Sequence, residues 1–300
     1  MYNRCQGDML YSKEEILRQL TTAWMGHNLL FLEETDSTNV QVQLAAMQGA
    51  PDGTMVVADK QTAGRGRRGR SWESPAGANV YFTLLLKPVV TPEAASKLTL
   101  LMAYAVKCAV EKYVPCAIKW PNDIVVDGKK VCGILTELRL EGTAIHHVVI
   151  GVGINVGKQA FAAELTDKAT SIAEVCEDAA ISRSQLIADI LKVFEEEYKS
   201  FVKAYEIQQA EAAVGNGSIY GGNQDVKCGR KPDLTGFVAK YNASLVNKDK
   251  EVCVLDPKGE YRGIARGIND QGELLVELAD GTVHAVYAGE VSVRGVYGYV

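Results

Sequence analysis

Strand-like segments follow one another closely through the middle of the chain, and this run constrains the fold most strongly. Each segment is rich in Val, Ile, Leu, Tyr or Phe, and most are joined by tight turns, which is typical of strands that share a sheet. The segments are 54–58, 79–86, 117–120, 123–126, 131–138 and 144–152. Helical patterns lie at both ends of the run. We therefore predict an α+β domain built on a mixed sheet.

Two helices are predicted before the first strand. Residues 12–15 form a capping box, so a helix begins there, and its apolar positions continue to Trp24. A second helix follows Asp36 and Ser37 and ends at Gly49. Its predicted inward face consists of Val40, Leu44 and Met47.

Two longer helices are predicted further along. Thr91 and the proline after it open a helix that runs to about Val114, where Pro115 ends it. Another helix covers 184–203. Its apolar face is made of Ile187, Leu191, Phe194, Tyr198 and Phe201, which indicates burial against the sheet.

The chain changes character after these elements. Residues 208–232 hold five glycines with little apolar periodicity, which indicates a linker or insertion. Four or five short strands follow, with turns at 256–259, 269–272 and 280–281, which favours a small barrel. The predicted units are 1–206, a linker at 207–233, and 234–300.

Composition narrows the class of protein. The chain has 300 residues, and its net charge of -5 argues against a protein whose main task is binding nucleic acid, because phosphate affinity comes from Lys and Arg. Seven scattered cysteines without a CxxC pair indicate mostly buried thiols, not disulfides or a zinc site. We see no secretory signal and no apolar run of bilayer length. A reduced, cytoplasmic enzyme that binds neither DNA nor membrane is expected.

The loop from Gly64 to Arg70 (sequence GRGRRGR) carries the first chemical signal. It satisfies G-x-G-x-x-G, but Ser71 to Pro75 cannot easily begin the helix that a dinucleotide site needs. Its glycines allow close backbone approach to a ligand, and its arginines can neutralise phosphate and carboxylate oxygens. We interpret it as a mobile anion clamp. A solvated basic loop or a nucleic-acid patch remains an equal alternative on composition alone.

Three further motifs place polar residues in apolar surroundings. They are Lys119 to Asp123 (KWPND), Lys129 to Leu135 (KKVCGIL) and Gly151 to Asn155 (GVGIN). A structural turn explains the first equally well. Lys130 enters an apolar strand, which is costly unless an anion is near, whereas Lys129 is expected to be solvated. The paired glycines of the third motif indicate close approach of a backbone or ligand.

Other catalytic patterns do not stand out in the sequence. There is no P-loop and no evident Ser-His-Asp or Cys-His order. The four histidines lack metal-ligand spacing, and His146 and His147 are expected on opposite faces of a strand. We therefore expect no metal site formed by protein ligands alone.

Together these segments resemble the biotin protein ligase family. The matching motifs occur in the family's order: Asp36 to Asn39, Gln61 to Arg70 with Ser71-Trp72, Ser74-Pro75 and Gly77 to Asn79, Lys119 to Asp123, Lys130 to Leu135, and Gly151 to Asn155. Residues 263–268 and 289–294 are similar to the family's SH3-like domain, and the resemblance covers roughly 12–203 and 234–295. Residues 208–232 are longer than the family's usual join. One capped helix before Asp36 is too little for a DNA-binding domain, so the form without that domain is expected.

The resemblance implies a fold and an activity. The fold would be a class II synthetase-like mixed sheet flanked by helices, followed by an SH3-like barrel. The activity would be that of a ligase that forms an amide (C–N) bond. It would convert biotin and ATP, with Mg²⁺ on the nucleotide, into biotinyl-adenylate and diphosphate. It would then transfer biotin to one lysine of a biotin carboxyl carrier domain of acetyl-CoA carboxylase, releasing AMP. A homodimer is left open.

The resemblance also implies roles for individual residues. Biotin would be bound by Ser37, Thr38, Asn39, Gln61, Arg65, Gly66, Arg67 and Lys130, with Ile134 and Leu135 along its tail. ATP or the adenylate would be bound by Arg67, Trp72, Asn122, Asp123 and Asn155, the last three toward the nucleotide or its metal. Arg65 and Lys130 would be catalytic, because cations relieve the repulsion between two anionic reactants.

Two alternatives compete with this interpretation. A biotin-responsive repressor is disfavoured by the short N-terminal segment and the acidic charge. A lipoate ligase or transferase shares the fold class, but the arginine-rich loop and the KWPND run favour biotin.

Overall fold

The computed structural model describes residues 11–176, 180–215, 234–256, 259–288 and 292–295. Its centre is a seven-stranded sheet in the order β1-β2-β3-β7-β6-β5-β4. The strands are β1 (Leu29–Thr35), β2 (Met55–Gln61), β3 (Val80–Leu86), β4 (Ala117–Lys119), β5 (Asp123–Val126), β6 (Lys129–Glu141) and β7 (Ala144–Ile154). β1 and β2 are parallel, and all other neighbours in this sheet are antiparallel. The predicted mixed sheet is confirmed.

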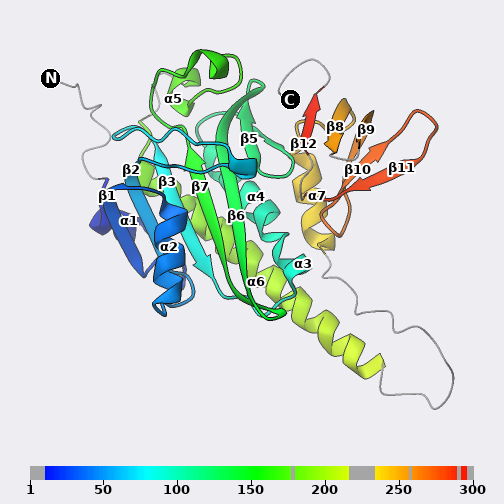
Figure 1. Ribbon diagram of the computed structural model, residues 1–300, viewed down its shortest axis with the longest axis horizontal. Helices are drawn as coiled ribbons and strands as arrows, with labels where there is room; N and C mark the ends of the chain where they lie inside the picture. Colours follow the sequence, from blue (N-terminus) through cyan, green and yellow to red (C-terminus); the bar gives the residue numbers. More distant parts are fainter. Residues whose placement is uncertain (1–10, 177–179, 216–233, 257–258, 289–291, 296–300) are drawn as a thin grey trace.

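Helices cover both faces of the sheet (Figure 1). α4 (Leu98–Val110) and α6 (Arg183–Gly215) lie behind it in that view, and α2 (Thr38–Met47) lies in front. The five predicted apolar positions of α6 are buried. On the α2 side a smaller cluster joins Val42, Ala46, Val56, Leu85 and Val149. Shorter helices are α1 (Lys13–Gln19), α3 (Pro92–Ala95), α5 (Ile172–Val175) and α7 (Thr235–Ala243), with 3-10 turns at Arg67–Gly69 and Ala163–Leu165.

The N-terminal part differs from prediction in two ways. α1 ends at Gln19 instead of reaching Trp24, since Leu20 is already extended. The buried Glu195 carboxylate of α6 accepts hydrogen bonds from the backbone N–H groups of Ala23, Trp24 and Met25, and this fixes a non-helical turn. β1 was not predicted. Its apolar residues give no clear alternation because it is a half-exposed edge strand.

The predicted inward face of α2 is wrong. Leu44 and Met47 are 52% and 56% exposed, and Val42 and Ala46 are buried in their place. The rotation of the helix is set by its first turn, where Asn39 binds Glu137 and Thr83 on the sheet. Polar contacts in the site therefore decide which side of α2 faces inward. Gly49 follows the helix end with φ +87°, as predicted for a stop.

The two long helices have other bounds than predicted. The helix expected over 91–114 is split into α3 and α4 around Ser96 and Lys97. Lys97 is buried there, and its Nζ donates to Asp270 O and Gln271 Oε1 of the C-terminal part. α6 continues to Gly215, so residues 207–215 of the expected linker are helical. The remainder, 216–233, lies outside the described residues.

The C-terminal part forms a second, five-stranded antiparallel sheet in the order β11-β10-β9-β8-β12. Its strands are β8 (Glu251–Asp256), β9 (Gly259–Ile268), β10 (Leu274–Glu277), β11 (Val283–Val286) and β12 (Ser292–Gly295). It is joined to the first sheet through β4: Ile118 N donates to Ser244 O at 2.7 Å, and Trp120 Nε1 donates to Gly272 O at 3.2 Å. The edge of the site is thereby fixed against the C-terminal strands.

Two minor expectations are corrected. His146 and His147 do not point apart: their rings are 4.9 Å apart, with the Nδ1 atoms at 2.6 Å. A bulge in the β6–β7 pairing explains this, because His147 pairs with Arg139 and Ile145 with Leu140, which leaves His146 as the extra residue. Of the five described cysteines, all free, Cys132 is buried and the others are partly exposed. Cys5 and Cys228 lie outside the described residues.

Candidate active site

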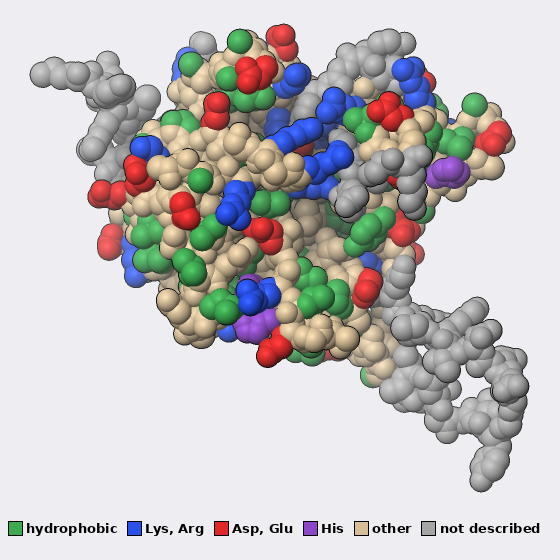
Figure 2. All heavy atoms as spheres, viewed as in Figure 1, with side chains coloured by type: hydrophobic (Ala, Val, Ile, Leu, Met, Phe, Trp, Pro, Cys, Tyr) green, Lys and Arg blue, Asp and Glu red, His purple; other side chains and the backbone are tan. Residues whose placement is uncertain are grey.

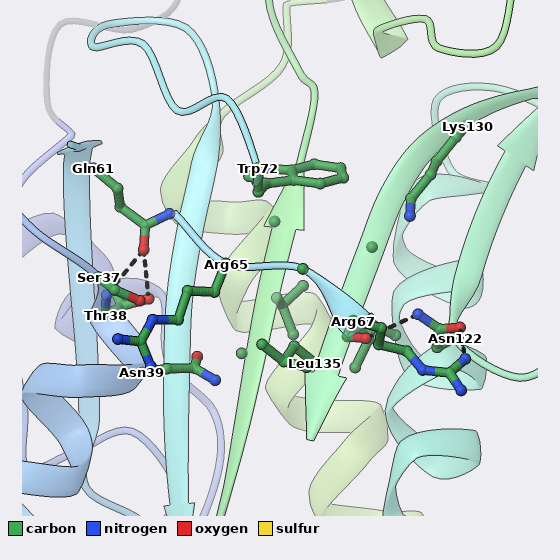
Figure 3. A pocket seen from close by; sticks show the side chains of 16 residues that line it. Ser37, Thr38, Asn39, Gln61, Arg65, Arg67, Trp72, Asn122, Lys130 and Leu135 are labelled. Carbon is green, nitrogen blue, oxygen red and sulfur yellow. Dashed lines mark hydrogen bonds between the residues drawn. The ribbon is translucent and has the colours of Figure 1, made fainter. Parts of the chain in front are cut away.

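A cavity on the α2 side of the sheet brings most of the predicted site residues together (Figure 3). Its walls are Ser37, Thr38, Asn39, Gln61, Arg65, Gly66, Arg67, Trp72, Asn122, Lys130, Gly133, Ile134, Leu135, Gly151, Val152 and Gly153. They come from α2, β2, the loop after β2, and strands β6 and β7. Its free volume is about 40 Å³, far below the roughly 300–1,000 Å³ of typical small-molecule sites. A ligand of drug size therefore requires the loop or Trp72 to shift.

One end of the cavity is built from uncharged groups that hold one another. Gln61 Oε1 accepts from Thr38 N at 2.9 Å and from Thr38 Oγ1 at 3.1 Å. Gln61 Nε2 donates to Ser74 Oγ at 2.9 Å. The Asn39 amide is held by the Thr83 hydroxyl at 2.7 Å and by Glu137 at 2.7 Å. We call this set, with Ser37, the amide end.

Sequence reasoning did not single out the supporting residues Thr83 and Glu137. Thr83 is fully buried in the otherwise apolar strand β3, and Glu137 interrupts the apolar residues of β6. A polar residue at a strand position that faces a helix was the available signal. Both act by orienting Asn39.

Three glycines form the floor of the cavity. A Cβ at Gly151 would collide with Asn39 Oδ1, and a Cβ at Gly153 would lie 2.6 Å from Trp72 Nε1. At Gly133 a Cβ would be 3.1 Å from the Trp72 ring. The close approach predicted from the paired glycines is thus made by side chains of α2 and of the loop.

The other end is cationic, and we call it the cationic end. Lys130 Nζ lies 2.7 Å from Asp123 Oδ1 and 5.2 Å from the centre of the Trp72 ring. Arg67 donates to Asn122 Oδ1 and to Ala288 O, both at 2.8 Å. Burial lowers the pKa of the Arg67 guanidinium, while the Asp123 charge opposes this shift. The positive charge of Arg67 is thus partly removed from water, and a bound anion would offset the free-energy cost of this burial.

The arginine loop has internal structure. Gly66 N donates to Arg70 O at 2.7 Å, and Trp72 N donates to Gly64 O at 2.9 Å. The two arginines of the cavity are directed to opposite ends: Arg65 toward Asn39, and Arg67 toward Asn122 (Figure 3). One short loop therefore supplies a cation to each end of the site.

Two predicted site residues do not line the cavity. Asp123 lies behind Lys130 and pairs with it. Asn155 is buried, and its Nδ2 donates to Thr170 O at 3.1 Å, so this group supports a neighbouring segment. Lys129, expected to be solvated, donates from the surface to Thr166 O. Lys130 is the lysine of this pair that reaches the cavity.

The described residues contain no helix long and apolar enough to span a bilayer. Nor do they contain a group of three or more His, Cys, Asp or Glu side chains placed to hold a metal ion.

Comparisons with known proteins agree with this geometry. Residues 31–155 match the "Biotin/lipoate A/B protein ligase family", and residues 249–294 match the "Biotin protein ligase C terminal domain". The chain is 35% identical over 284 residues to the bifunctional ligase/repressor BirA of Bacillus subtilis, covering 93% of this chain and 78% of that protein. It is 34% identical over 266 residues to the biotin–[acetyl-CoA-carboxylase] ligase of Mycobacterium tuberculosis, covering 86% of each.

A solved structure shares the whole architecture. The biotin protein ligase of Aquifex aeolicus, in complex with biotin and ATP, superposes with a TM-score of 0.69 at 28% identity, covering 89% of this chain and 99% of that one. The match therefore extends over most of this chain and nearly the whole of that protein. The fold, the composition of the cavity and these relatives lead to one conclusion: the chain belongs to the biotin protein ligase family and is a ligase.

Proposed function

We propose that this ligase first joins biotin to ATP as biotinyl-adenylate and then transfers biotin to a lysine of a carrier protein. One observation carries the proposal: a single cavity has one end built from amide and hydroxyl groups, toward which Arg65 is directed, and another end that holds Arg67 and Lys130. Biotin has an uncharged ureido ring and a carboxylate, and ATP adds a polyphosphate. The complex of the Aquifex aeolicus relative with biotin and ATP supports this choice of substrates.

The amide end suits the ureido ring. That ring offers donors and an acceptor in fixed directions, and Ser37, Thr38, Asn39 and Gln61 offer complementary groups whose orientations are already set. Ile134 and Leu135 stand along the path toward the cationic end and would contact the apolar tail. A biotin substrate is preferred over lipoate because residues 249–294 match the C-terminal domain of biotin protein ligases.

The cationic end suits the first chemical step. A carboxylate oxygen of biotin attacks the α-phosphorus of ATP, and the bond to the bridging oxygen breaks with its electron pair leaving on diphosphate. Both reactants are anions, so Arg67 and Lys130 at this end, together with Arg65 from the same loop, would lower their repulsion and stabilise the charge that moves. Asp123 would orient Lys130, and Trp72 and Asn122 would contact the nucleotide. Mg²⁺ would enter with the nucleotide as part of the substrate.

In the second step the amine of an acceptor lysine attacks the carbonyl carbon, and AMP leaves. No covalent enzyme intermediate is needed. The acceptor would be a biotin carboxyl carrier domain, consistent with relatives named biotin–[acetyl-CoA-carboxylase] ligase. We also propose a division into a catalytic unit (1–206), a join (207–233) and a C-terminal unit (234–300), with α6 extending into the join.

A direct assay tests the proposal. The protein is incubated with biotin, α-labelled ATP and a purified biotin carrier domain, and labelled adenylate and biotinylated carrier are measured separately. Both products are expected, and a carrier whose acceptor lysine is changed to arginine should stop the reaction at the adenylate. Lipoate in place of biotin is the specificity control. Absence of adenylate with biotin, or equal use of lipoate, would overturn the proposal.

A further inference from the structure

The arginine loop (Gly64 to Arg70) leads to β3 through a short stem, Ser74 to Gly77, that is bound back onto β2. The carbonyl of the first stem residue accepts a hydrogen bond from Gln61 N at 3.1 Å. The backbone N–H of the last stem residue donates to Asp59 Oδ2 at 3.0 Å. Gln61 and Asp59 both belong to β2 and lie two residues apart. The stem is thus held at two points, while residues of the loop line the cavity.

The Asp59 carboxylate is itself held from another side. Its Oδ1 accepts a hydrogen bond from Arg183 Nη1 at 2.6 Å. Arg183 is buried, its Cζ lies 3.8 Å from the centre of the Tyr11 ring, and its Nη1 also donates to Asn79 O at 3.3 Å. A carboxylate paired with a buried guanidinium has less freedom to move than one that faces water alone. Asp59 is therefore a fixed acceptor for the backbone N–H of Gly77.

Asn79 lies two residues after the stem and is fully buried. Its Oδ1 accepts a hydrogen bond from Val156 N at 2.9 Å, and its Nδ2 donates to Tyr81 Oη at 2.9 Å and to Gln159 Oε1 at 2.7 Å. Because this amide uses its acceptor and both its donors, an apolar residue here would leave buried polar groups without partners. Val156 and Gln159 follow β7, so Asn79 joins the stem to the segment after that strand.

The segment after β7, residues 155–171, also holds the backbone of Lys130. Lys130 N donates to Lys168 O at 2.7 Å, and Lys130 O accepts from Thr170 N at 3.0 Å. The side chain of Lys130 lines the cavity. The arginine loop and the segment that holds this lysine are therefore both attached to the same buried contacts around Asn79.

The cations cannot set their own positions by mutual attraction. Figure 2 shows Lys and Arg side chains gathered on the face where the arginine loop lies in Figure 1. Like charges repel one another, so contacts elsewhere must hold the two segments in place. Their placement matters because a shift of about 1 Å can lower the rate of a chemical step roughly a hundredfold.

We propose that Asp59 and Asn79 are positioning residues for the formation of biotinyl-adenylate. Asp59 fixes the stem of the arginine loop, and Asn79 fixes that stem relative to the segment that holds Lys130. Neither residue lines the cavity, so both act through the groups that they hold. The proposal rests on the proposed function and deepens it: the cations of the two segments meet the same α-phosphate in a fixed arrangement.

Single-turnover synthesis of adenylate with labelled ATP tests the proposal, because it gives a rate constant and an amplitude separately. In Asp59→Asn the rate constant should fall about tenfold, and bound adenylate should leave the enzyme about tenfold faster, as for loss of one charge-assisted contact. The dissociation constant for biotin alone should change by less than about threefold, because the amide end keeps its own contacts. Glu34→Gln, which removes an exposed ion pair with Lys60, is the matched control with no change expected.

Asn79→Ala should lower the rate constant of adenylate formation further, by about tenfold to a hundredfold, because it releases the two segments from each other. Tyr81→Phe is the second variant if Asn79→Ala does not fold. It removes only the hydroxyl that donates to Pro75 O and accepts from Asn79 Nδ2, and the rate constant should fall several-fold.

A purely structural role predicts a different result. It would lower the amplitude, because fewer molecules fold, and leave the rate constant and the release rate of the adenylate unchanged. Unchanged rate constants in both Asp59→Asn and Tyr81→Phe would therefore overturn the proposal. A wild-type protein that forms no adenylate would instead refute the ligase function itself.

Discussion

The two ends of the cavity are built by opposite means. At the amide end the polar side chains of Thr38, Asn39 and Gln61 bind one another or the sheet. At the cationic end Lys130 forms an ion pair with Asp123, and the charge of the same carboxylate acts on Arg67. The amide and hydroxyl groups of the first end are held in fixed directions, which suits recognition of shape and hydrogen bonds. At the second end the cations repel one another, and a bound anion lowers this repulsion. That arrangement suits stabilisation of the negative charge that develops during the reaction.

The largest effect is expected at the cationic end. Lys130→Ala should lower the rate of adenylate formation by more than a hundredfold, because it removes the cation nearest the α-phosphate and leaves Asp123 without its 2.7 Å partner. Biotin binding at the amide end should change little. The measurement is single-turnover synthesis with labelled ATP, together with circular dichroism to verify the fold. Lys129→Ala is the control, and near-normal synthesis by a folded Lys130→Ala protein would remove Lys130 from the mechanism.

The burial of the charged Lys119 side chain should affect how the free energy of unfolding depends on pH. Lys119 has a pKa of about 8 in the folded protein, below the roughly 10.4 expected when unfolded. Below pH 8 both states are charged, and the folded state bears the full cost of burying the charge. Between about pH 8 and 10 the unfolded chain binds more protons at this residue, so the free energy of unfolding gains a positive slope with pH.

Lys119→Met should therefore be more stable than wild type at pH 7, by at most roughly 3 kcal/mol. The difference should shrink as the pH rises toward 10, because the wild-type lysine becomes neutral. Urea unfolding of both proteins at several pH values measures this, and other titrating groups cancel in the comparison. A difference that does not depend on pH would mean that Lys119 is not strained by its charge.

A smaller effect, confined to the KM for biotin, is expected at the amide end. Gln61→Ala removes the acceptor of two hydrogen bonds from Thr38 and the donor to Ser74. The KM for biotin should rise about tenfold, as for loss of one or two neutral hydrogen bonds, while the KM for ATP stays within twofold. The loss should depend little on salt, because the hydrogen bonds that are removed join uncharged groups. A parallel rise in both KM values would show that the two ends are not separable.

The difference between the two ends also explains which residues and elements could be predicted from the sequence. The cationic residues Arg65, Arg67 and Lys130 were found because a charge in a glycine-rich or apolar context is conspicuous. The strands β2 to β7 were found because apolar and aromatic residues cluster there. The rotation of α2 was missed because Leu44 and Met47 form an apolar stripe that competes with the true one. The rotation of α2 is set by the contacts of its Asn39 with Glu137 and Thr83. Because these two residues are distant in the sequence, the apolar periodicity of the helix cannot predict the rotation.

The most subtle test concerns the loop that joins the two ends. Hydrogen bonds from Gly66 N to Arg70 O and from Trp72 N to Gly64 O hold this loop, together with the contacts of Arg67, and the cavity has about 40 Å³ of free volume. Binding must therefore open these contacts and then replace them with stronger ones to phosphate and carboxylate oxygens. Trypsin cleavage at Arg65, Arg67, Arg68 and Arg70 should become several-fold slower with biotin plus ATP, and only slightly slower with biotin alone. The reason is the same asymmetry: the ring of biotin contacts the amide end, and the nucleotide brings phosphate oxygens to the end that holds Arg67 and Lys130. If biotin alone protected the loop from trypsin as well as biotin plus ATP does, ordering of the loop would depend on the amide end and not on the cationic end.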